Sequence, residues 1–206
     1  MNIPLDKRIV PVTTLKDVED ALPLAEALLA GGLDTLEITF RTAAAPAAVR
    51  RIADKFPALR IGAGTLLEKK QLAEARDAGA AFGVAPGLNR AIVEEAGRIG
   101  FPFMPGVMTP SEVENGISLG CKLLKFFPAN LAGGIPMLQA LAGPYAQTGV
   151  KFVVLGGVTP QNMREFLDLP IVAAVGGSWI ADPKLIAAKD WKQITQRAKD
   201  ALAVAK

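Results

Sequence analysis

Two lysines interrupt an apolar segment near the middle of the chain, GCKLLKFFPAN at residues 120–130. A lysine is rarely buried unless it is paired, so a lysine inside a core strand needs a reason. Side chains alternate along a strand, and Lys122 and Lys125 have opposite parity, so only one of them can face inward. We expect Lys125, which is nearer the carboxyl end, to face inward and Lys122 to face solvent or a helix.

Lys125 could act as a nucleophile. Burial among apolar neighbours favours the neutral amine, and a neutral amine attacks the carbon of a carbonyl group. The structural alternative is that Lys125 extends its ammonium group to the surface along its apolar stem. The chain contains no histidine, so the usual side chain for proton transfer near neutral pH is missing.

The segment LEITFRT at residues 36–42 supplies a second set of polar groups. Its apolar and polar residues alternate, so a strand would place Glu37, Thr39 and Arg41 on one face. If the apolar residues face surrounding helices, these three side chains point into the mouth of a barrel. The alternative is a structural ion pair between Glu37 and Arg41 at the end of the strand.

Paired glycines follow the last two predicted strands, in LGGV at 155–158 and VGGSW at 175–179. Glycines expose backbone N–H groups, and phosphate sites of α/β barrels are frequently built from the loops after strands seven and eight. Ser178 adds a hydroxyl donor. We therefore predict a phosphate site here, with tight turns as the alternative; no Walker or GxGxxG motif indicates a nucleotide.

The elements that would position these residues alternate between short β-rich runs and helical patterns along the whole chain. Eight runs are predicted as strands: 8–12, 35–40, 59–64, 81–86, 101–106, 121–127, 151–157 and 171–177. Strands separated by helices pair in parallel through right-handed crossovers, and eight such units favour a closed (β/α)₈ TIM barrel. An open doubly wound sheet is the alternative. We expect a single domain over residues 1–206.

Composition excludes several classes of protein. Half of the 206 residues are hydrophobic and 21% are charged, which supports a buried core rather than disorder. The net charge is +3 without a basic run, so we expect no nucleic-acid partner. Cys121 is the single cysteine, which rules out an internal disulfide and a cysteine-based metal cluster. With neither a signal-peptide pattern nor a membrane-spanning apolar run, we expect a soluble, cytoplasmic protein.

Seven motifs occur in one order along the chain: LEITFRT, GAGT, APGL, PGVMTPSE, KFFPA, AGP and VGGSW. In this combination the chain resembles the 2-keto-3-deoxy-6-phosphogluconate (KDPG) aldolases and the related 4-hydroxy-2-oxoglutarate aldolases over residues 8–204. The resemblance implies that Lys125 is the Schiff-base lysine and Glu37 the general acid/base. It also implies a homotrimer without a metal or organic cofactor.

The resemblance further implies a set of substrate contacts. Arg41 and Thr65 would hold the carboxylate of the pyruvyl group, and Ser178 would contribute to the phosphate end. The remaining expected substrate contacts are Pro86, Phe127, Gly156, Gly157, Gly176 and Gly177.

The implied reaction is cleavage of KDPG to pyruvate and D-glyceraldehyde 3-phosphate. One alternative is another 2-oxo acid lyase, such as a 4-hydroxy-2-oxoglutarate aldolase that releases glyoxylate and pyruvate, or a lyase for the galactonate-derived phosphosugar acid. Another is a phosphosugar isomerase or synthase that uses Glu37 and Lys125 without covalent attachment. A third is a non-catalytic barrel that binds a phosphorylated metabolite.

One residue departs from the family pattern. The family usually has PTGG at the end of strand seven, whereas this chain has Leu155 before Gly156 and Gly157. The threonine hydroxyl of the family would point toward the pyruvyl carboxylate. Losing a hydrogen bond to a charged group weakens binding by about 1 kcal/mol or more, so we expect an effect on substrate choice and efficiency but not on Schiff-base chemistry.

Overall fold

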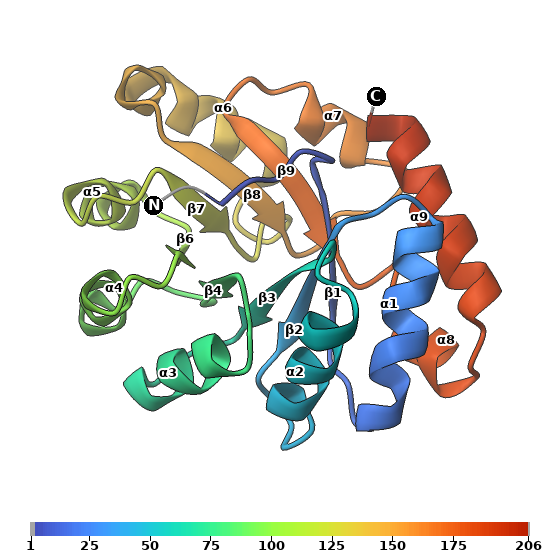
Figure 1. Ribbon diagram of the computed structural model, residues 1–206. Coiled ribbons are helices and arrows are strands. Elements are labelled where there is room, and N and C mark those ends of the chain that lie inside the picture. The colour runs from blue at the N-terminus through green and yellow to red at the C-terminus, as the bar shows by residue number, and fades with distance from the viewer. Residues whose placement is uncertain (1–2, 206) are drawn as a thin grey trace.

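The computed structural model describes residues 3–205 and has a parallel β-barrel at its centre with helices around it (Figure 1). The strands follow one another around the sheet in the order β5-β4-β3-β2-β1-β9-β8-β7-β6. Their bounds are β1 (Ile9–Thr13), β2 (Thr35–Thr39), β3 (Arg60–Gly64), β4 (Phe82–Val84), β5 (Phe103–Met104), β6 (Gly106–Val107), β7 (Leu123–Phe126), β8 (Lys151–Leu155) and β9 (Val172–Gly177).

The two ends of this strand order are joined by Pro105, which lies between β5 and β6. β5 pairs with β4, and β6 pairs with β7. The Pro105 carbonyl accepts a hydrogen bond from Lys125 N at 2.9 Å, and Gly106 N donates to the Gly87 carbonyl at 3.2 Å. The predicted (β/α)₈ barrel is therefore confirmed. The single strand predicted over 101–106 is wrong, because a proline has no N–H to continue the ladder.

Helices connect consecutive strands, except β5 and β6, and cover the outside of the barrel (Figure 1). Their bounds are η1 (Val18–Asp20), α1 (Ala21–Ala30), α2 (Ala45–Lys55), α3 (Lys69–Asp77), α4 (Arg90–Arg98), α5 (Pro110–Ser118), α6 (Gly134–Tyr145), η2 (Ala146–Thr148), α7 (Met163–Leu167), α8 (Pro183–Ala187) and α9 (Trp191–Ala205). No helix within residues 3–205 is long and apolar enough to cross a membrane.

Two loops that follow strands show which residues determine where the next helix begins. Thr109 caps α5 with a capping box to Glu112, as its position before a proline predicts. Thr159 also precedes a proline, but α7 begins only after Asn162. The Asn162 side chain accepts a hydrogen bond from Thr159 N at 2.8 Å and donates to the Gly157 carbonyl at 3.0 Å. This side-chain turn occupies the residues where a helix would otherwise start.

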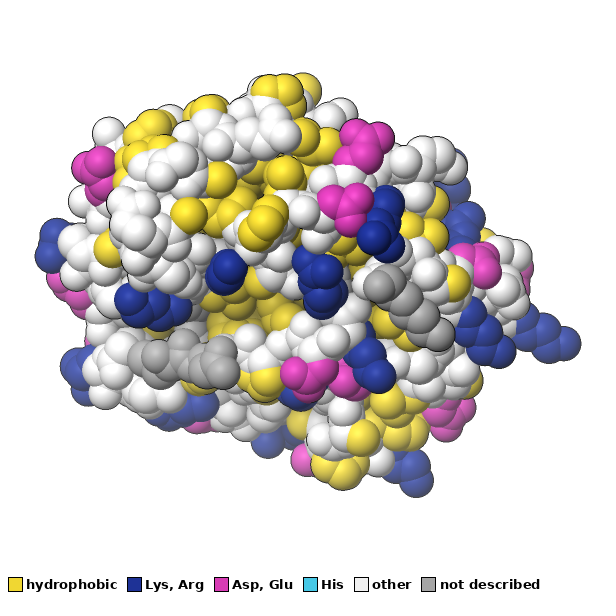
Figure 2. All heavy atoms as spheres, turned by 90° about the horizontal axis from the view of Figure 1, so that it is seen from above, with side chains coloured by type: hydrophobic (Ala, Val, Ile, Leu, Met, Phe, Trp, Pro, Cys, Tyr) yellow, Lys and Arg dark blue, Asp and Glu magenta, His cyan; other side chains and the backbone are white. Residues whose placement is uncertain are grey.

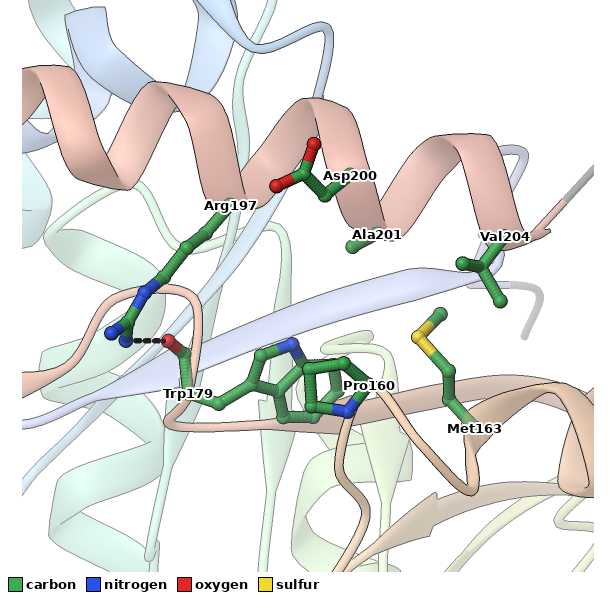
Figure 3. A pocket seen from close by; sticks show the side chains of 7 residues that line it. All are labelled: Pro160, Met163, Trp179, Arg197, Asp200, Ala201 and Val204. Carbon is green, nitrogen blue, oxygen red and sulfur yellow. Dashed lines mark hydrogen bonds between the residues drawn. The ribbon is translucent and has the colours of Figure 1, made fainter.

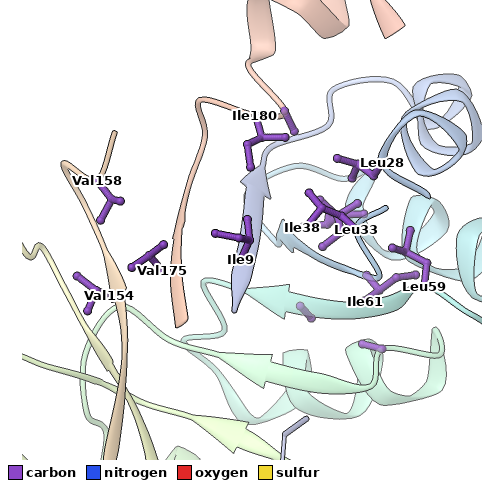
Figure 4. Close-up of a cluster of buried hydrophobic side chains, with 14 of the residues drawn as sticks. Ile9, Leu28, Leu33, Ile38, Leu59, Ile61, Val154, Val158, Val175 and Ile180 are labelled. Carbon is purple, nitrogen blue, oxygen red and sulfur yellow. The ribbon is translucent and has the colours of Figure 1, made fainter. Parts of the chain in front are cut away.

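Two hydrophobic clusters follow from the alternation of side chains along the strands. Outward residues such as Ile9, Ile38 and Ile61 pack against the helices, including Leu28 of α1 (Figure 4). A smaller cluster fills the barrel itself and consists of Ile3, Val10, Phe82, Val84, Met104, Val153, Leu155 and Ala174. Because β2 turns its isoleucine outward, Glu37 between its apolar neighbours must turn inward.

Candidate active site

A cavity of about 690 Å³ opens at the carboxyl ends of the strands, where the sites of α/β barrels are built. Its lining brings together every residue predicted for the site except Gly176. The residues that line it are Val12, Thr13, Thr14, Glu37, Thr39, Arg41, Thr65, Pro86, Lys125, Phe127, Leu155, Gly156, Gly157, Val158, Gly177, Ser178, Trp179, Asp182 and Pro183. Gly176 lies within β9, and a Cβ at this position would overlap the Val10 carbonyl.

Lys125 lies in β7 and points into the barrel. The residue is 6% exposed, so the alternative in which it extends to the surface is wrong. Its Nζ lies 3.3 Å from Glu37 Oε1 and 5.2 Å from the centre of the Phe127 ring. Lys122 is exposed on the opposite face, as the alternation along the strand predicts. A buried amine is thus held between a carboxylate and an aromatic ring at the cavity wall.

Glu37 lies in β2 and is completely buried. Its Oε1 contacts Lys125, whereas Oε2 has no hydrogen-bond partner among the described residues. A buried carboxylate oxygen without a partner is costly, and such groups are concentrated where a ligand or water completes the site. Space for the carboxylate depends on Gly64, since a Cβ there would overlap Oε1.

Arg41 does not pair with Glu37, so the alternative of a structural ion pair at the end of the strand is wrong. Arg41 Nε instead donates a hydrogen bond to Thr65 Oγ1 at 3.1 Å. Thr65 has a φ of 61°, in the left-handed region that favours glycine. Such strain costs about 1–3 kcal/mol and is typical of ligand-binding positions. The exposed guanidinium and this hydroxyl form a polar edge that fits an anionic group.

The loops that follow β8 and β9 contain the paired glycines and form another part of the cavity mouth. Gly156 and Gly157 have φ values of 92° and 86°, which side chains rarely adopt. A Cβ at Gly156 would lie 2.9 Å from Pro128 Cα, so the close approach of the segment after β7 also requires glycine. Ser178 is exposed beside Gly177 after β9. Residues of both loops line the cavity at its rim, where the sequence predicted an anion site.

Leu155 separates this rim from the interior of the barrel. It lines the cavity and is 4% exposed. It also packs in the cluster that fills the barrel, beside Val153 and Phe127. The cavity floor beside the lysine is consequently apolar and continuous with the core.

Part of the cavity wall was not predicted from the sequence. The additional residues are Val12, Thr13, Thr14, Val158, Trp179, Asp182 and Pro183. Thr14 Oγ1 and Thr39 Oγ1 are hydrogen-bonded at 2.7 Å, and Thr13 Oγ1 donates to the Ala181 carbonyl at 3.0 Å. The adjacent threonines at the end of the first strand were the available signal, because polar residues at strand ends line the mouth of a barrel.

Within the part of the chain that the structure describes, no three His, Cys, Asp or Glu side chains converge to hold a metal ion. The chemical groups that line the cavity are an amine, the two carboxylates of Glu37 and Asp182, a guanidinium, several hydroxyls and backbone amides. The amine can attack a carbonyl carbon, and the carboxylate can move protons beside it.

Comparison with known proteins agrees with this arrangement. The family model for KDPG and KHG aldolases matches residues 2–197. The KHG/KDPG aldolase of Escherichia coli (strain K12) is 43% identical over 198 residues, which cover 96% of this chain and 92% of that protein. The 2-dehydro-3-deoxy-phosphogluconate aldolase of Pseudoalteromonas atlantica is also 43% identical, covering 95% of this chain and 90% of the relative.

Two solved structures have the same fold. The KDPG aldolase of Legionella pneumophila, with pyruvate captured at low pH as a covalent carbinolamine intermediate, has a TM-score of 0.91 and 43% identity, covering 97% of this chain and 94% of that chain. The Zymomonas mobilis ZM4 aldolase with 3-phosphoglycerate has a TM-score of 0.87 and 39% identity, covering 95% and 91%. The chain is an aldolase, a carbon–carbon lyase. It belongs to the KDPG and KHG aldolase family.

Proposed function

We propose that the chain is a class I aldolase that cleaves KDPG to pyruvate and D-glyceraldehyde 3-phosphate. The observation that carries this proposal is the buried pair formed by Lys125 and Glu37, 3.3 Å apart at the wall of the cavity. The covalent carbinolamine of pyruvate in the Legionella pneumophila relative supports the same chemistry.

Lys125 Nζ attacks the C2 ketone of the substrate and forms a carbinolamine. Loss of water from the carbinolamine gives an iminium ion, which is an electron sink. Removal of the proton from the C4 hydroxyl then breaks the C3–C4 bond, and the bonding electrons flow to the iminium nitrogen. D-Glyceraldehyde 3-phosphate leaves, and an enamine of pyruvate remains. Protonation of C3 and addition of water release pyruvate and regenerate the amine.

Glu37 moves the protons in these steps. Its Oε1 is beside the amine, and its Oε2 is buried without a partner among residues 3–205. A water held at Oε2 would carry a proton to or from the carbinolamine, the C4 hydroxyl and C3 of the enamine. Positioned proton transfer of this kind typically contributes about 10²–10⁴-fold to the rate. One carboxylate with a water therefore replaces the missing histidine.

The two sides of the cavity mouth hold the two ends of the substrate. Arg41 and Thr65, hydrogen-bonded at 3.1 Å, form the polar edge that would bind the carboxylate. Ser178 with the backbone amides around Gly157 and Gly177 would bind the phosphate. Pro86 and Phe127 line the cavity between these ends and exclude water from the reacting carbons.

A 4-hydroxy-2-oxoglutarate aldolase is the second candidate. It uses the same imine and releases glyoxylate instead of a phosphorylated aldehyde. The acidic Asp182 in the wall favours it, because a carboxylate does not attract phosphate. Comparison of kcat/KM for KDPG and for 4-hydroxy-2-oxoglutarate decides between the two substrates.

We also propose that the protein assembles as a homotrimer. Three large hydrophobic residues are strongly exposed, Leu67 at 55%, Met108 at 40% and Leu131 at 89%. They follow β3, β6 and β7, so they belong to loops on one side of the barrel mouth. Exposed apolar surface of this kind is typical of protein interfaces. Light scattering after size exclusion gives the oligomeric state, and a monomer would contradict the proposal.

Borohydride trapping with pyruvate tests the proposed function directly. We expect a reduced pyruvyl adduct in the intact mass and, after digestion, on the peptide that carries Lys125. A Lys122→Ala variant is the matched control and should be labelled like the parent. A folded protein that gives no adduct would contradict the imine mechanism and favour an isomerase or a non-catalytic binding barrel.

A further inference from the structure

The loop between β9 and α8 carries an acidic residue to the predicted phosphate side of the cavity. Asp182 lines the cavity together with Ser178 and Trp179 of the same loop. Its Oδ1 accepts a hydrogen bond from Lys184 N at 2.8 Å, which caps α8 and fixes the carboxylate at the rim. A carboxylate at this position repels a phosphate dianion, because like charges disfavour each other across a short distance.

The cavity lining offers little positive charge to offset Asp182. Among the described residues that line it, the basic ones are Lys125 and Arg41. Lys125 is paired with Glu37, and Arg41 is hydrogen-bonded to Thr65 at the end of β3. The charge that acts on Asp182 comes instead from outside the cavity.

Arg197 on α9 provides this charge and also holds the loop. Its Nη1 donates a hydrogen bond to the Trp179 carbonyl at 2.5 Å and lies 3.6 Å from Asp182 Oδ2. Figure 3 shows Arg197 extending from α9 to the Trp179 backbone. Both side chains of the ion pair are 34% exposed, so the pair is within reach of solvent but not freely mobile.

The outer side of the loop leaves room for movement. A second pocket of about 350 Å³ separates Trp179 from α9 and is lined also by Pro160, Met163 and Ala201 (Figure 3). Trp179 lines this pocket on one side and the active-site cavity on the other. Without the hydrogen bond from Arg197, the Trp179 segment could shift into this space and carry Ser178 with it.

We propose that Arg197 is a positioning residue that sets the preference of this aldolase for a phosphorylated aldehyde end. It neutralises Asp182 and fixes the Trp179–Asp182 segment, so that the rim accepts a dianion. This inference rests on the proposed function, since it assigns the phosphate to this side of the cavity. Arg197 acts through Asp182 and the loop and does not touch the substrate.

Steady-state kinetics on KDPG and on unphosphorylated 2-keto-3-deoxygluconate tests the proposal. We expect Arg197→Met to raise KM for KDPG about 3- to 10-fold, as for a partly exposed charge near an anion. The kcat/KM for the unphosphorylated substrate should stay within about twofold, because it carries no dianion. Arg197→Lys, which keeps the charge, should retain most of the preference. Arg98→Met on α4, which removes an exposed ion pair with Glu95, is the matched control.

The Asp182→Asn variant separates the charge of the pair from its contribution to folding. We expect this variant to lower KM for KDPG. In the Asp182→Asn background, the effect of Arg197→Met on KM should shrink to less than about twofold, because substitutions at two residues in contact do not have additive effects. Equal losses on both substrates, or an undiminished Arg197 effect in the Asp182→Asn background, would overturn the proposal.

Two further measurements separate this inference from the proposed function. Borohydride trapping of pyruvate should be the same in the parent and in all Arg197 and Asp182 variants. Binding of inorganic phosphate, followed by tryptophan fluorescence, should weaken in Arg197→Met and strengthen in Asp182→Asn. Absence of trapping in the parent would refute the imine mechanism alone, whereas unchanged phosphate binding in the variants would refute the role of Arg197 alone.

Discussion

The two sides of the active-site cavity are built in different ways. Lys125 and Glu37 belong to the strands β7 and β2, and both are buried. The other part of the cavity consists of the loops after β8 and β9, where Ser178 and Gly157 are exposed. Strands hold their side chains through ladders on both edges, whereas a loop depends on a few anchoring contacts. In the function that we propose, bond breaking would take place on the rigid strands, and the leaving aldehyde would be recognised by the more adjustable loops.

The difference also predicts how each side responds to substitution. Changes on the strand side should affect the chemical step for every substrate. Changes on the loop side should alter the choice between substrates while the imine still forms. The following variants test this division, from the largest expected effect to the smallest.

Lys125→Ala should abolish both turnover and borohydride trapping, because no other described amine lines the wall beside Glu37. Activity on phosphorylated and unphosphorylated substrates should be lost together. Removal of one partner of a buried ion pair also costs about 3–5 kcal/mol of stability. Circular dichroism and urea unfolding therefore accompany the activity assay.

A double variant separates the loss of the nucleophile from the loss of stability. The double variant Lys125→Met with Glu37→Gln removes both charges of the pair and should be more stable than Lys125→Ala. It should still form no adduct with pyruvate. A Lys125→Ala protein with nearly normal aldolase rates would contradict the assignment of the nucleophile.

Glu37→Gln should lower kcat by about 10²–10⁴-fold, because the amide cannot accept or deliver protons. Slow imine formation should persist, so mass spectrometry after long incubation with pyruvate and borohydride should detect the adduct. Glu74→Gln, at an exposed position of α3, is the matched control. Rapid trapping and rapid turnover in Glu37→Gln would show that another group moves the protons.

Gly64→Ala should displace the Glu37 carboxylate, since the added Cβ overlaps Oε1. A displacement of about 1 Å can lower the rate by about 10²-fold, and overpacking in the core costs about 1–3 kcal/mol. Gly87→Ala is the control, because a Cβ there meets nothing within 4 Å. Full activity in Gly64→Ala would show that the reaction tolerates a shifted carboxylate.

Leu155→Thr should raise kcat/KM for KDPG, with Leu155→Val as the control of nearly the same shape. A new hydroxyl in the floor can donate to the substrate carboxylate, and a hydrogen bond to a charged group contributes about 1.5–3 kcal/mol. We expect a gain of up to about tenfold for threonine over valine, measured with both phosphorylated and unphosphorylated substrates. Equal activity of the two variants would place the carboxylate elsewhere.

The charges on the face of the molecule seen in Figure 2 do not separate into an acidic and a basic side. On the face viewed in Figure 2, acidic and basic side chains are interspersed around a hollow with hydrophobic side chains at its base. The selectivity for an anionic substrate that we propose would therefore depend on Arg41 in the cavity wall and on the Arg197–Asp182 pair at its rim.

Much of the fold and of the site could be predicted because it depends on local patterns. Alternation along single strands predicted that Glu37 and Lys125 face inward, as observed, and that Lys122 faces solvent or a helix; it is exposed. The interruption at Pro105 and the turn made by Asn162 were not predicted, because both depend on which hydrogen bonds compete at one position.

The sequence by itself determined the alternation of strands and helices, the inward direction of the two reactive side chains and the glycine loops, because each is a property of a few consecutive residues. Only the tertiary structure decided that Glu37 pairs with Lys125, 88 positions away, rather than with Arg41. It also decided that Arg197 reaches Asp182 behind the rim. The physical reason is closure of the barrel. Closure sets the distances between elements that are far apart in the sequence, and no pattern of consecutive residues contains those distances.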